Sequence, residues 1–245
     1  MMALILICND DGIEAKGLNT LYSELIKKFD VIVAAPDKER SASSHSLTID
    51  RMPEYKKIKK NIYSIDGTPA DCIYIALRKI LDKKPDLVIS GINHGANVAE
   101  DIFYSGTVSA ALEAAMHNIP AIAVSVAEKS ARFFEIAAKF SCKVAELLLT
   151  GKTLPNNTIL NINVPNLPAE LIEGVRITIQ GRRNSSNSPF SSIMKDDKRA
   201  LSGREAAQFT DYVALSNNMI SITPLSTDLT NYSFVDELLE WDLKI

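Results

Sequence analysis

The chain has 245 residues, of which 46% are hydrophobic and 23% charged, a composition typical of a globular protein with a sizeable core. Its formal net charge is −3 and its Lys and Arg residues are scattered, which argues against a surface that binds polymeric nucleic acid. The three cysteines lie far apart without a CxxC spacing, so neither a structural zinc site nor a disulfide framework is expected.

The first expected element is a strand at residues 3–8, because the segment ALILIC is apolar on both faces, as in a covered parallel sheet. This start lacks the basic region and the cleavage site of a signal peptide. No apolar run approaches the ~20 residues that a membrane-spanning helix needs. We therefore expect a cytoplasmic protein with no membrane partner.

Helical and strand patterns then alternate. Residues 18–26 carry apolar side chains at helical spacing, and residues 31–35 form a second buried strand that ends at Pro36. A polar loop follows, and the less hydrophobic stretch that leads to Ile65 is expected to form hairpin strands. This stretch contains the basic run at residues 56–60, which we interpret as a solvated edge strand protected by lysine.

The next helix is predicted to begin at Thr68, with Pro69 at its first position, and to run to about residue 81. A buried strand at residues 87–89 and an alanine-rich helix at residues 107–117 follow.

Residues 121–126 are predicted as one more strand, and a helix is expected from about residue 131 to residue 150, ending at Gly151. The whole order predicts an α/β fold with a doubly wound, mainly parallel sheet and right-handed crossovers.

The last third of the chain is more polar than the rest. It contains four short apolar segments, expected as strands at 159–164, 175–179 and 220–223 and a helix at 234–241, with a polar tract between them at 182–210. Such a segment has too few apolar residues to fold alone. We therefore divide the chain into an α/β core, residues 1–180, which is expected to carry the functional site, and an extension, residues 181–245, that packs on the core or on a neighbouring subunit.

Polar segments that follow predicted strands or open predicted helices carry the candidate functional residues, at 9–12, 40–46, 90–97 and 104–108. Ligands of open α/β sheets bind beyond the carboxyl ends of the strands, so one sheet can bring these segments together. The first contains Asp10 and Asp11, whose adjacent carboxylates repel each other unless a cation offsets them. Oxygen ligands of this kind suit Mg²⁺, Mn²⁺ or Ca²⁺, although Asp11-Gly12 is equally compatible with a plain turn.

Two of the other three segments each allow two interpretations. Residues 40–46 offer hydroxyls for a metal or a phosphate, or form an ordinary polar loop. The glycines at 90–97 fit neither a Walker loop nor a dinucleotide fingerprint, so ATP and NAD are not expected. Residues 105–107 form either an anion site at a helix N-terminus or a plain helix cap. Together the four segments supply acids, hydroxyls and amides, the groups required for metal-assisted phosphoryl transfer to water.

Five motifs of the chain closely resemble the SurE family of 5′/3′-nucleotidases. They are NDDG at 9–12, APDKERSASSHSLT at 35–48, DGTPADC at 66–72, SGINHGAN at 90–97 and YSGTVSAALEA at 104–114. The resemblance covers the chain to about residue 130 and continues more loosely through NINVPN at 161–166 and GRR at 181–183.

This resemblance implies a Rossmann-like fold and hydrolysis of nucleoside 5′- and 3′-monophosphates. It also implies that the carboxy-terminal part exchanges elements between subunits of a homodimer or homotetramer. One divalent cation, Mg²⁺ or Mn²⁺, is implied for each subunit. Its implied ligands are Asp10, Asp11, Ser41 and Asn93, and the implied phosphate contacts are Asn97, Ser105, Gly106 and Thr107.

One departure from the family pattern concerns the loop after the second strand. Family members often carry Asn where this chain has His45, so we expect Ser43, Ser44 and His45 only as possible substrate contacts. His94 is a candidate to approach the leaving group, whereas we interpret His117, at a helix C-terminus, as structural.

The expected mechanism is direct attack of a metal-activated water on phosphorus, with a carboxylate of Asp10 or Asp11 orienting or deprotonating that water. One alternative is a phosphatase with an aspartate nucleophile, which would want an Asp-x-Asp motif and a later lysine. The other is a nucleotide- or metal-sensing module without turnover.

Overall fold

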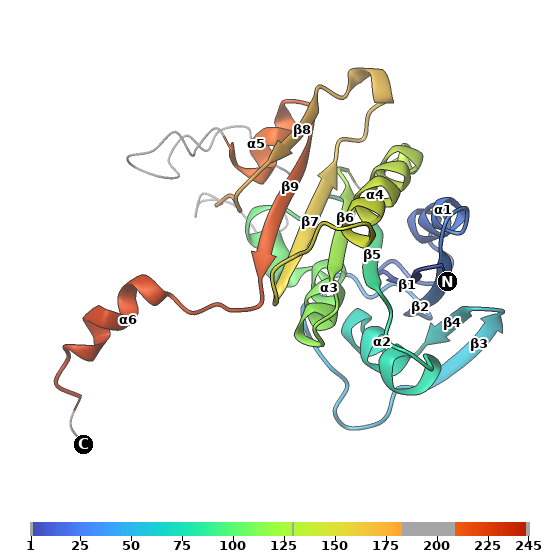
Figure 1. Cartoon of the computed structure of the whole chain (residues 1–245), viewed down its shortest axis with the longest axis horizontal. Coiled ribbons are helices and arrows are strands. Elements are labelled where there is room, and N and C mark those ends of the chain that lie inside the picture. The colour runs from blue at the N-terminus through green and yellow to red at the C-terminus, as the bar shows by residue number, and fades with distance from the viewer. Residues whose placement is uncertain (1, 129, 183–208, 244–245) are drawn as a thin grey trace.

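The computed structural model describes residues 2–128, 130–182 and 209–243, and these residues build one sheet of nine strands covered by helices (Figure 1). The strand order is β3-β4-β2-β1-β5-β6-β7-β9-β8. The strands are β1 Leu4–Cys8, β2 Asp30–Pro36, β3 Tyr55–Lys59, β4 Ile62–Ile65, β5 Leu87–His94, β6 Ala121–Val126, β7 Thr158–Val164, β8 Gly174–Ile177 and β9 Met219–Ser226.

The central strands run parallel, from β4 through β2, β1, β5 and β6 to β7. Antiparallel pairs occur between β3 and β4 and between β7 and β9, while β8 runs parallel to β9. The α/β class and the mainly parallel sheet that the sequence predicts are therefore confirmed. The lysine-rich segment forms β3, an exposed edge strand, as expected.

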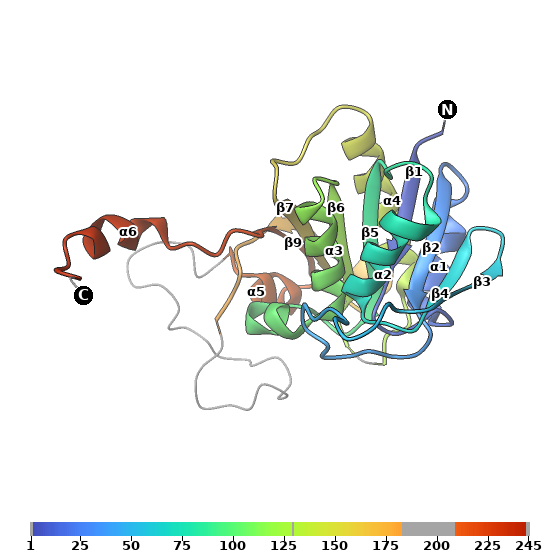
Figure 2. The ribbon, with the colours of Figure 1, turned by 90° about the horizontal axis from the view of Figure 1, so that it is seen from below.

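Helices cover both faces of this sheet (Figure 2). On one face, α1 and α4 pack over side chains that include Ile5 and Ile7 of β1; on the other, α2 and α3 pack over Leu6 and Cys8. Alternate residues of a strand point to opposite faces, so a strand covered on both sides is apolar at every position. The helices are α1 Lys16–Leu25, α2 Pro69–Ile75, α3 Gly106–Met116, α4 Phe134–Leu149, α5 Asp211–Ser216 and α6 Tyr232–Leu239.

Two elements differ most from their predicted bounds. The strand expected at residues 87–89 continues to His94, with an irregularity in its pairing with β6 between Ser90 and Asn93. The helix expected to reach residue 81 is α-helical only to Ile75 and continues as a π-helical turn, Ala76–Ile80. Local periodicity does not report either feature, because both depend on how the backbone packs against neighbouring elements.

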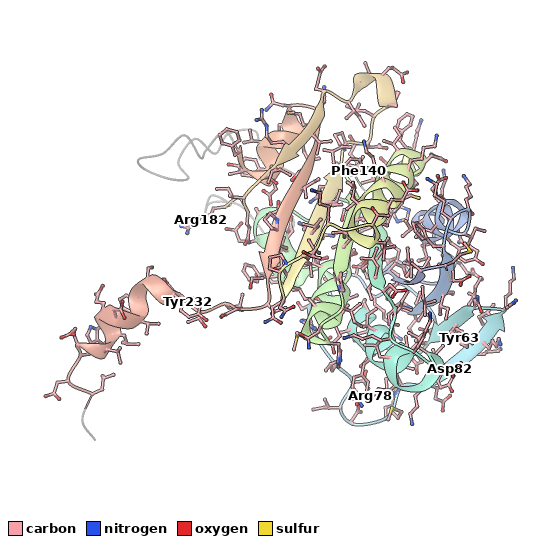
Figure 3. The ribbon with its side chains drawn as sticks, in the orientation of Figure 1. Tyr63, Arg78, Asp82, Phe140, Arg182 and Tyr232 are labelled. Atoms are coloured by element: carbon pink, nitrogen blue, oxygen red, sulfur yellow. The ribbon has the colours of Figure 1, made fainter. Side chains whose placement is uncertain are left out.

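The carboxy-terminal part contributes directly to the sheet. β9 lies between β7 and β8, and α5 packs beside it. By contrast, α6 projects from the body, with Tyr232 at its start (Figure 3). The division at residue 180 stays a prediction, and most of the polar tract at 182–210 lies outside the described residues. No described helix is both long enough and apolar enough to span a membrane.

Candidate active site

The candidate site lies where the chain changes direction across the sheet. From β1 the chain passes to β2 on one side, and it later returns to β5 on the other side of β1. Ligand sites of open α/β sheets form at such switch points, beyond the carboxyl ends of the strands. Asp10 and Asp11 follow β1, residues 37–46 follow β2, and β5 ends at Asn93 and His94.

Asp10 is fixed by the beginning of α3. Its carboxylate Oδ1 accepts a hydrogen bond from the Thr107 hydroxyl at 2.5 Å, and Oδ2 accepts one from the Thr107 backbone N–H at 3.2 Å. Burial raises the pKa of Asp10 to about 6; the negative charge of Asp11 adds to this effect, while the bonds from Thr107 oppose it. A nearby cation stabilises the ionised form of an aspartate in such a setting.

Asp11 is held by the end of β5. Its Oδ2 accepts from the His94 backbone N–H at 3.2 Å and lies 2.9 Å from His94 Nδ1. The His94 ring also packs edge-on against Phe134 of α4, with the ring centroids 4.7 Å apart. The hydrogen bond to Asp11 raises the pKa of His94, although partial burial opposes this. Asp11 and the imidazole therefore form a fixed pair.

The other two expected metal ligands lie next to residues that contact the acids. Asn93 precedes His94, and Ser41 follows Arg40, whose backbone N–H donates to the Asp10 carbonyl at 2.7 Å. The Asn93 Nδ2 donates to the Gly95 carbonyl, which leaves the amide oxygen available for a cation. The Ser41 hydroxyl donates to Glu39 at 2.6 Å, and a hydroxyl oxygen retains lone pairs for a further partner.

The chemistry of these donors fits a hard divalent cation. In the described part of the chain, no three His, Cys, Asp or Glu side chains gather closely enough to hold an ion by themselves. A cation here would therefore need hydroxyl and amide oxygens besides the two carboxylates, a ligand set typical of Mg²⁺ or Mn²⁺ rather than zinc. Within the same described residues, the fully buried Asn9 Oδ1 has no hydrogen-bond partner, so an unpaired acceptor also lies beside the acids.

The turn at residues 105–107 opens α3 and touches the acids. Ser105 is the helix cap, since its Oγ accepts from the Val108 N–H at 3.0 Å. A Cβ on Gly106 would lie 2.8 Å from Ser43 Oγ and 2.9 Å from Asp10 Cβ, so only glycine fits between them. The hydroxyl and N–H of Thr107 both donate to Asp10. Its expected contact with phosphate stays a prediction, as do those of Ser105 and Gly106.

Asn97 is embedded in a buried amide network. Its N–H donates to Asn163 Oδ1 and its Nδ2 to Ser125 Oγ, both at 2.8 Å. Its carbonyl accepts from Asn161 Nδ2 at 2.8 Å and from Asn163 Nδ2 at 3.1 Å. These three partners are not among the candidate residues expected from the sequence. The sequence does contain a signal for two of them. Asn161 and Asn163 stand at alternate positions of a mainly apolar strand and therefore share one face of β7.

The serine loop, residues 41–46, lies against the beginning of α3. The Ser44 N–H donates to the Tyr104 carbonyl at 3.2 Å. His45 Nε2 lies 2.8 Å from Glu113 Oε2, a contact that sequence reasoning also missed. The structure thus brings the serine loop, the 105–107 turn and the two acids together, and the contacts of Ser43, Ser44 and His45 with substrate remain predictions.

This fold and site define a Rossmann-like α/β protein with a candidate ligand site at the β1/β5 switch point. A family model described as "Survival protein SurE" matches residues 5–187. The chain therefore belongs to the SurE family.

Relatives and a solved structure agree with this assignment. A protein of Geobacter sp. (strain M21) named "5'-nucleotidase SurE" is 43% identical over 249 residues, which cover 98% of this chain and 99% of the relative. A protein of the same name from Methylobacillus flagellatus is 41% identical, covering 97% of this chain and 98% of the relative. The crystal structure of a SurE protein from Aquifex aeolicus superposes with a TM-score of 0.84 at 39% identity, covering 96% and 98% of the two chains.

Proposed function

We propose that this chain, a 5′-nucleotidase of the SurE family, uses one divalent cation to hydrolyse nucleoside 5′- and 3′-monophosphates to nucleoside and phosphate. The 5′-nucleotidase activity follows from family membership and from relatives of that name over nearly the whole chain. The observation that carries the rest is the contact between Asp10 and Thr107, which joins a pair of carboxylates to the N-terminus of α3.

The residues proposed to hold the cation are Asp10, Asp11, Ser41 and Asn93. When bound, a divalent cation supplies positive charge that polarises a phosphoryl oxygen and lowers the pKa of water. Burial and the negative charge of Asp11 disfavour the ionised form of Asp10, and a positive charge beside it would stabilise that form.

The chain itself is proposed to bind and orient the phosphate. The 105–107 turn presents the positive end of an 11-residue helix, a position that favours an anion. Asn97 is the further proposed phosphate contact, and its buried amide partners fix its backbone before substrate arrives. A carboxylate of Asp10 or Asp11 orients or deprotonates the attacking water, which forms the new bond to phosphorus as the ester oxygen leaves.

The decisive test is phosphate release from AMP or GMP with added Mg²⁺ or Mn²⁺, with and without a chelator. Asp10→Asn and Asp11→Asn should each lower kcat by about a hundredfold or more, because they remove a ligand and a proton acceptor. Asp82→Asn is the matched control. Asp82 (Figure 3) is exposed and precedes β5, so it lies toward the amino end of that strand, whereas the site lies at the carboxyl ends.

Three results would reject the mechanism. Full activity of either site variant, with circular dichroism showing a folded protein, would contradict the proposed roles of the acids. A trapped phosphoaspartyl enzyme would favour the aspartate-nucleophile alternative. Tight binding of AMP without phosphate release in the presence of metal would favour a sensing module.

The proposal extends to assembly and location. A homodimer or homotetramer is proposed because α6 has no buried residue among the described ones, while its apolar side chains are exposed. A cytoplasmic location is proposed because Cys8, Cys72 and Cys142 are all free and buried.

A further inference from the structure

Two of the three histidines of the chain meet on one buried carboxylate, outside the pair formed by His94 and Asp11. Glu113 lies on α3, and its side chain is 7% exposed. Its Oε2 is 2.8 Å from His45 Nε2, and its Oε1 is 3.2 Å from His117 Nε2. Burial favours the neutral acid, but the two imidazoles outweigh this effect and lower the pKa of Glu113. The carboxylate is therefore an acceptor, and both ring nitrogens donate to it.

The two histidines come from different parts of the fold. His117 caps the C-terminus of the same helix, four residues after Glu113. His45 belongs to the serine loop, 68 residues away in sequence, and Figure 2 shows the chain between β2 and β3 running past α2 toward α3. The His45–Glu113 contact therefore joins the loop to the helix, whereas the His117–Glu113 contact joins the helix to itself.

The serine loop needs such an attachment because its backbone is strained. Ala42 and Ser44 have φ values of 56° and 52°, in the left-handed region that residues other than glycine rarely adopt. Conformations of this kind persist only where the surroundings hold them. Three other contacts help. The Ser44 N–H donates to the Tyr104 carbonyl, and the Thr68 hydroxyl donates to the Ser46 carbonyl at 2.7 Å. The buried Ser43 hydroxyl lies where a Cβ on Gly106 would contact it.

We propose that His45 is a positioning residue, which holds the serine loop against the 105–107 turn by donating its Nε2–H to Glu113. In this role His45 acts on substrate through Ser43 and Ser44, which it keeps beside the phosphate position, and not through contact with the reacting atoms. The inference rests on the proposed function for its effect on turnover. Its structural part, the attachment of the loop, does not depend on that function.

Three variants test the proposal: His45→Ala, His45→Gln and His117→Ala. His45→Ala and His117→Ala each remove one imidazole from Glu113, but only the first releases the loop. His45→Gln retains an N–H donor at similar reach. The readouts are hydrogen exchange of residues 41–48 in the free protein, KM and kcat for AMP with Mg²⁺, and inhibition by inorganic phosphate.

We expect His45→Ala to speed exchange at the Ser44 amide and to raise KM and the inhibition constant for phosphate, each about tenfold, which corresponds to about 1.4 kcal/mol. The kcat should change less than KM, because the acids keep their contacts. His45→Gln should recover most of the loss, and His117→Ala should leave exchange of the loop and KM within about twofold, as expected for a contact that does not reach the loop.

Unchanged exchange at Ser44 in His45→Ala would overturn the proposal, and so would equal effects of His45→Ala and His117→Ala. Failure of His45→Gln to recover the loss would overturn the assigned hydrogen bond. If the unmodified protein releases no phosphate from AMP, the proposed function fails, while the exchange measurements still decide whether His45 holds the loop.

Discussion

At the scale of single residues, the site contains buried or adjacent carboxylates whose negative charge is unfavourable unless a partner stabilises it. Asp10 is buried beside Asp11, and its two hydrogen bonds from Thr107 do not compensate for the loss of water. The carboxylate of Asp11, by contrast, is paired with the imidazole of His94. The acid that lacks a cationic partner within the described protein is thus the one most directly placed for an ion.

Asp10 predicts a specific dependence of stability on pH in the metal-free protein. Its pKa is about 6 in the folded state against an ordinary 3.8, so the folded state binds more protons between these values. The contribution of Asp10 to the free energy of unfolding is therefore fully present below about pH 4 and is lost as pH rises through 6. The loss amounts to roughly 3 kcal/mol, at about 1.4 kcal/mol per pKa unit.

Asp10→Asn should remove this dependence, because the amide carries no charge and can still pair with Thr107. In chelator, we expect the variant to unfold at a higher temperature than the unmodified protein at pH 7.5 and at a similar temperature near pH 4, as measured by calorimetry. A lower melting temperature of the variant at pH 7.5 would show that burial does not penalise the Asp10 charge.

At the scale of elements, strand β7 does more than extend the sheet. Asn161 and Asn163 are fully buried on the same face, and both donate to the Asn97 carbonyl. Asn163 also accepts the Asn97 N–H. Strand β7 therefore supports the loop after β5 through two buried asparagines, which connect the expected phosphate contact to the centre of the sheet.

Asn163→Ala should reduce both stability and nucleotide binding. It leaves the Asn97 N–H buried without a partner, which costs about 1–3 kcal/mol, and it allows Asn97 to move. Urea unfolding and KM for AMP measure the two effects. Thr158→Ala is the control on the same strand, since within the described part of the chain the Thr158 hydroxyl makes one hydrogen bond, a long one of 3.4 Å to the Asn156 carbonyl. An unaltered KM for Asn163→Ala would show that this hydrogen-bond network does not affect nucleotide binding.

At the scale of the whole molecule, the chain presents an unpartnered apolar element. α6 and the residues around it expose large side chains, among them Leu229 at 82% and Leu239 at 76%. Phe234 and Trp241 contact each other edge-on with centroids 6.0 Å apart, so the segment has internal order without packing on the body. This exposed apolar surface is the observation behind the proposed assembly of subunits.

Removal of residues 228–245 should therefore lower the oligomeric state without unfolding the core. Light scattering coupled to size exclusion measures the mass, and circular dichroism follows the fold. Leu239→Ser with Trp241→Ser should act as the deletion does, whereas Glu237→Gln with Glu240→Gln should not. A full-length chain that is already monomeric at micromolar concentration would refute the role of α6 in assembly.

The sequence by itself determined the class of fold and the family. Segments such as residues 3–8, apolar at every position, predicted a parallel sheet covered on both faces, because each face of the sheet meets a hydrophobic layer. The acidic, glycine-rich and hydroxyl-rich motifs predicted which segments follow the strands. Their resemblance to the SurE family is confirmed by the family model.

Only the tertiary structure decided which side chains meet. Asp10 meets Thr107 across 97 residues, Asp11 meets His94 across 83, and His45 meets Glu113 across 68. Strand order brings these segments to one edge of the sheet, but their pairing depends on strand register, on loop backbone and on where each helix begins. Hydrophobic periodicity records which side of an element is buried, and it contains no information about hydrogen-bond partners beyond the ends of the strands.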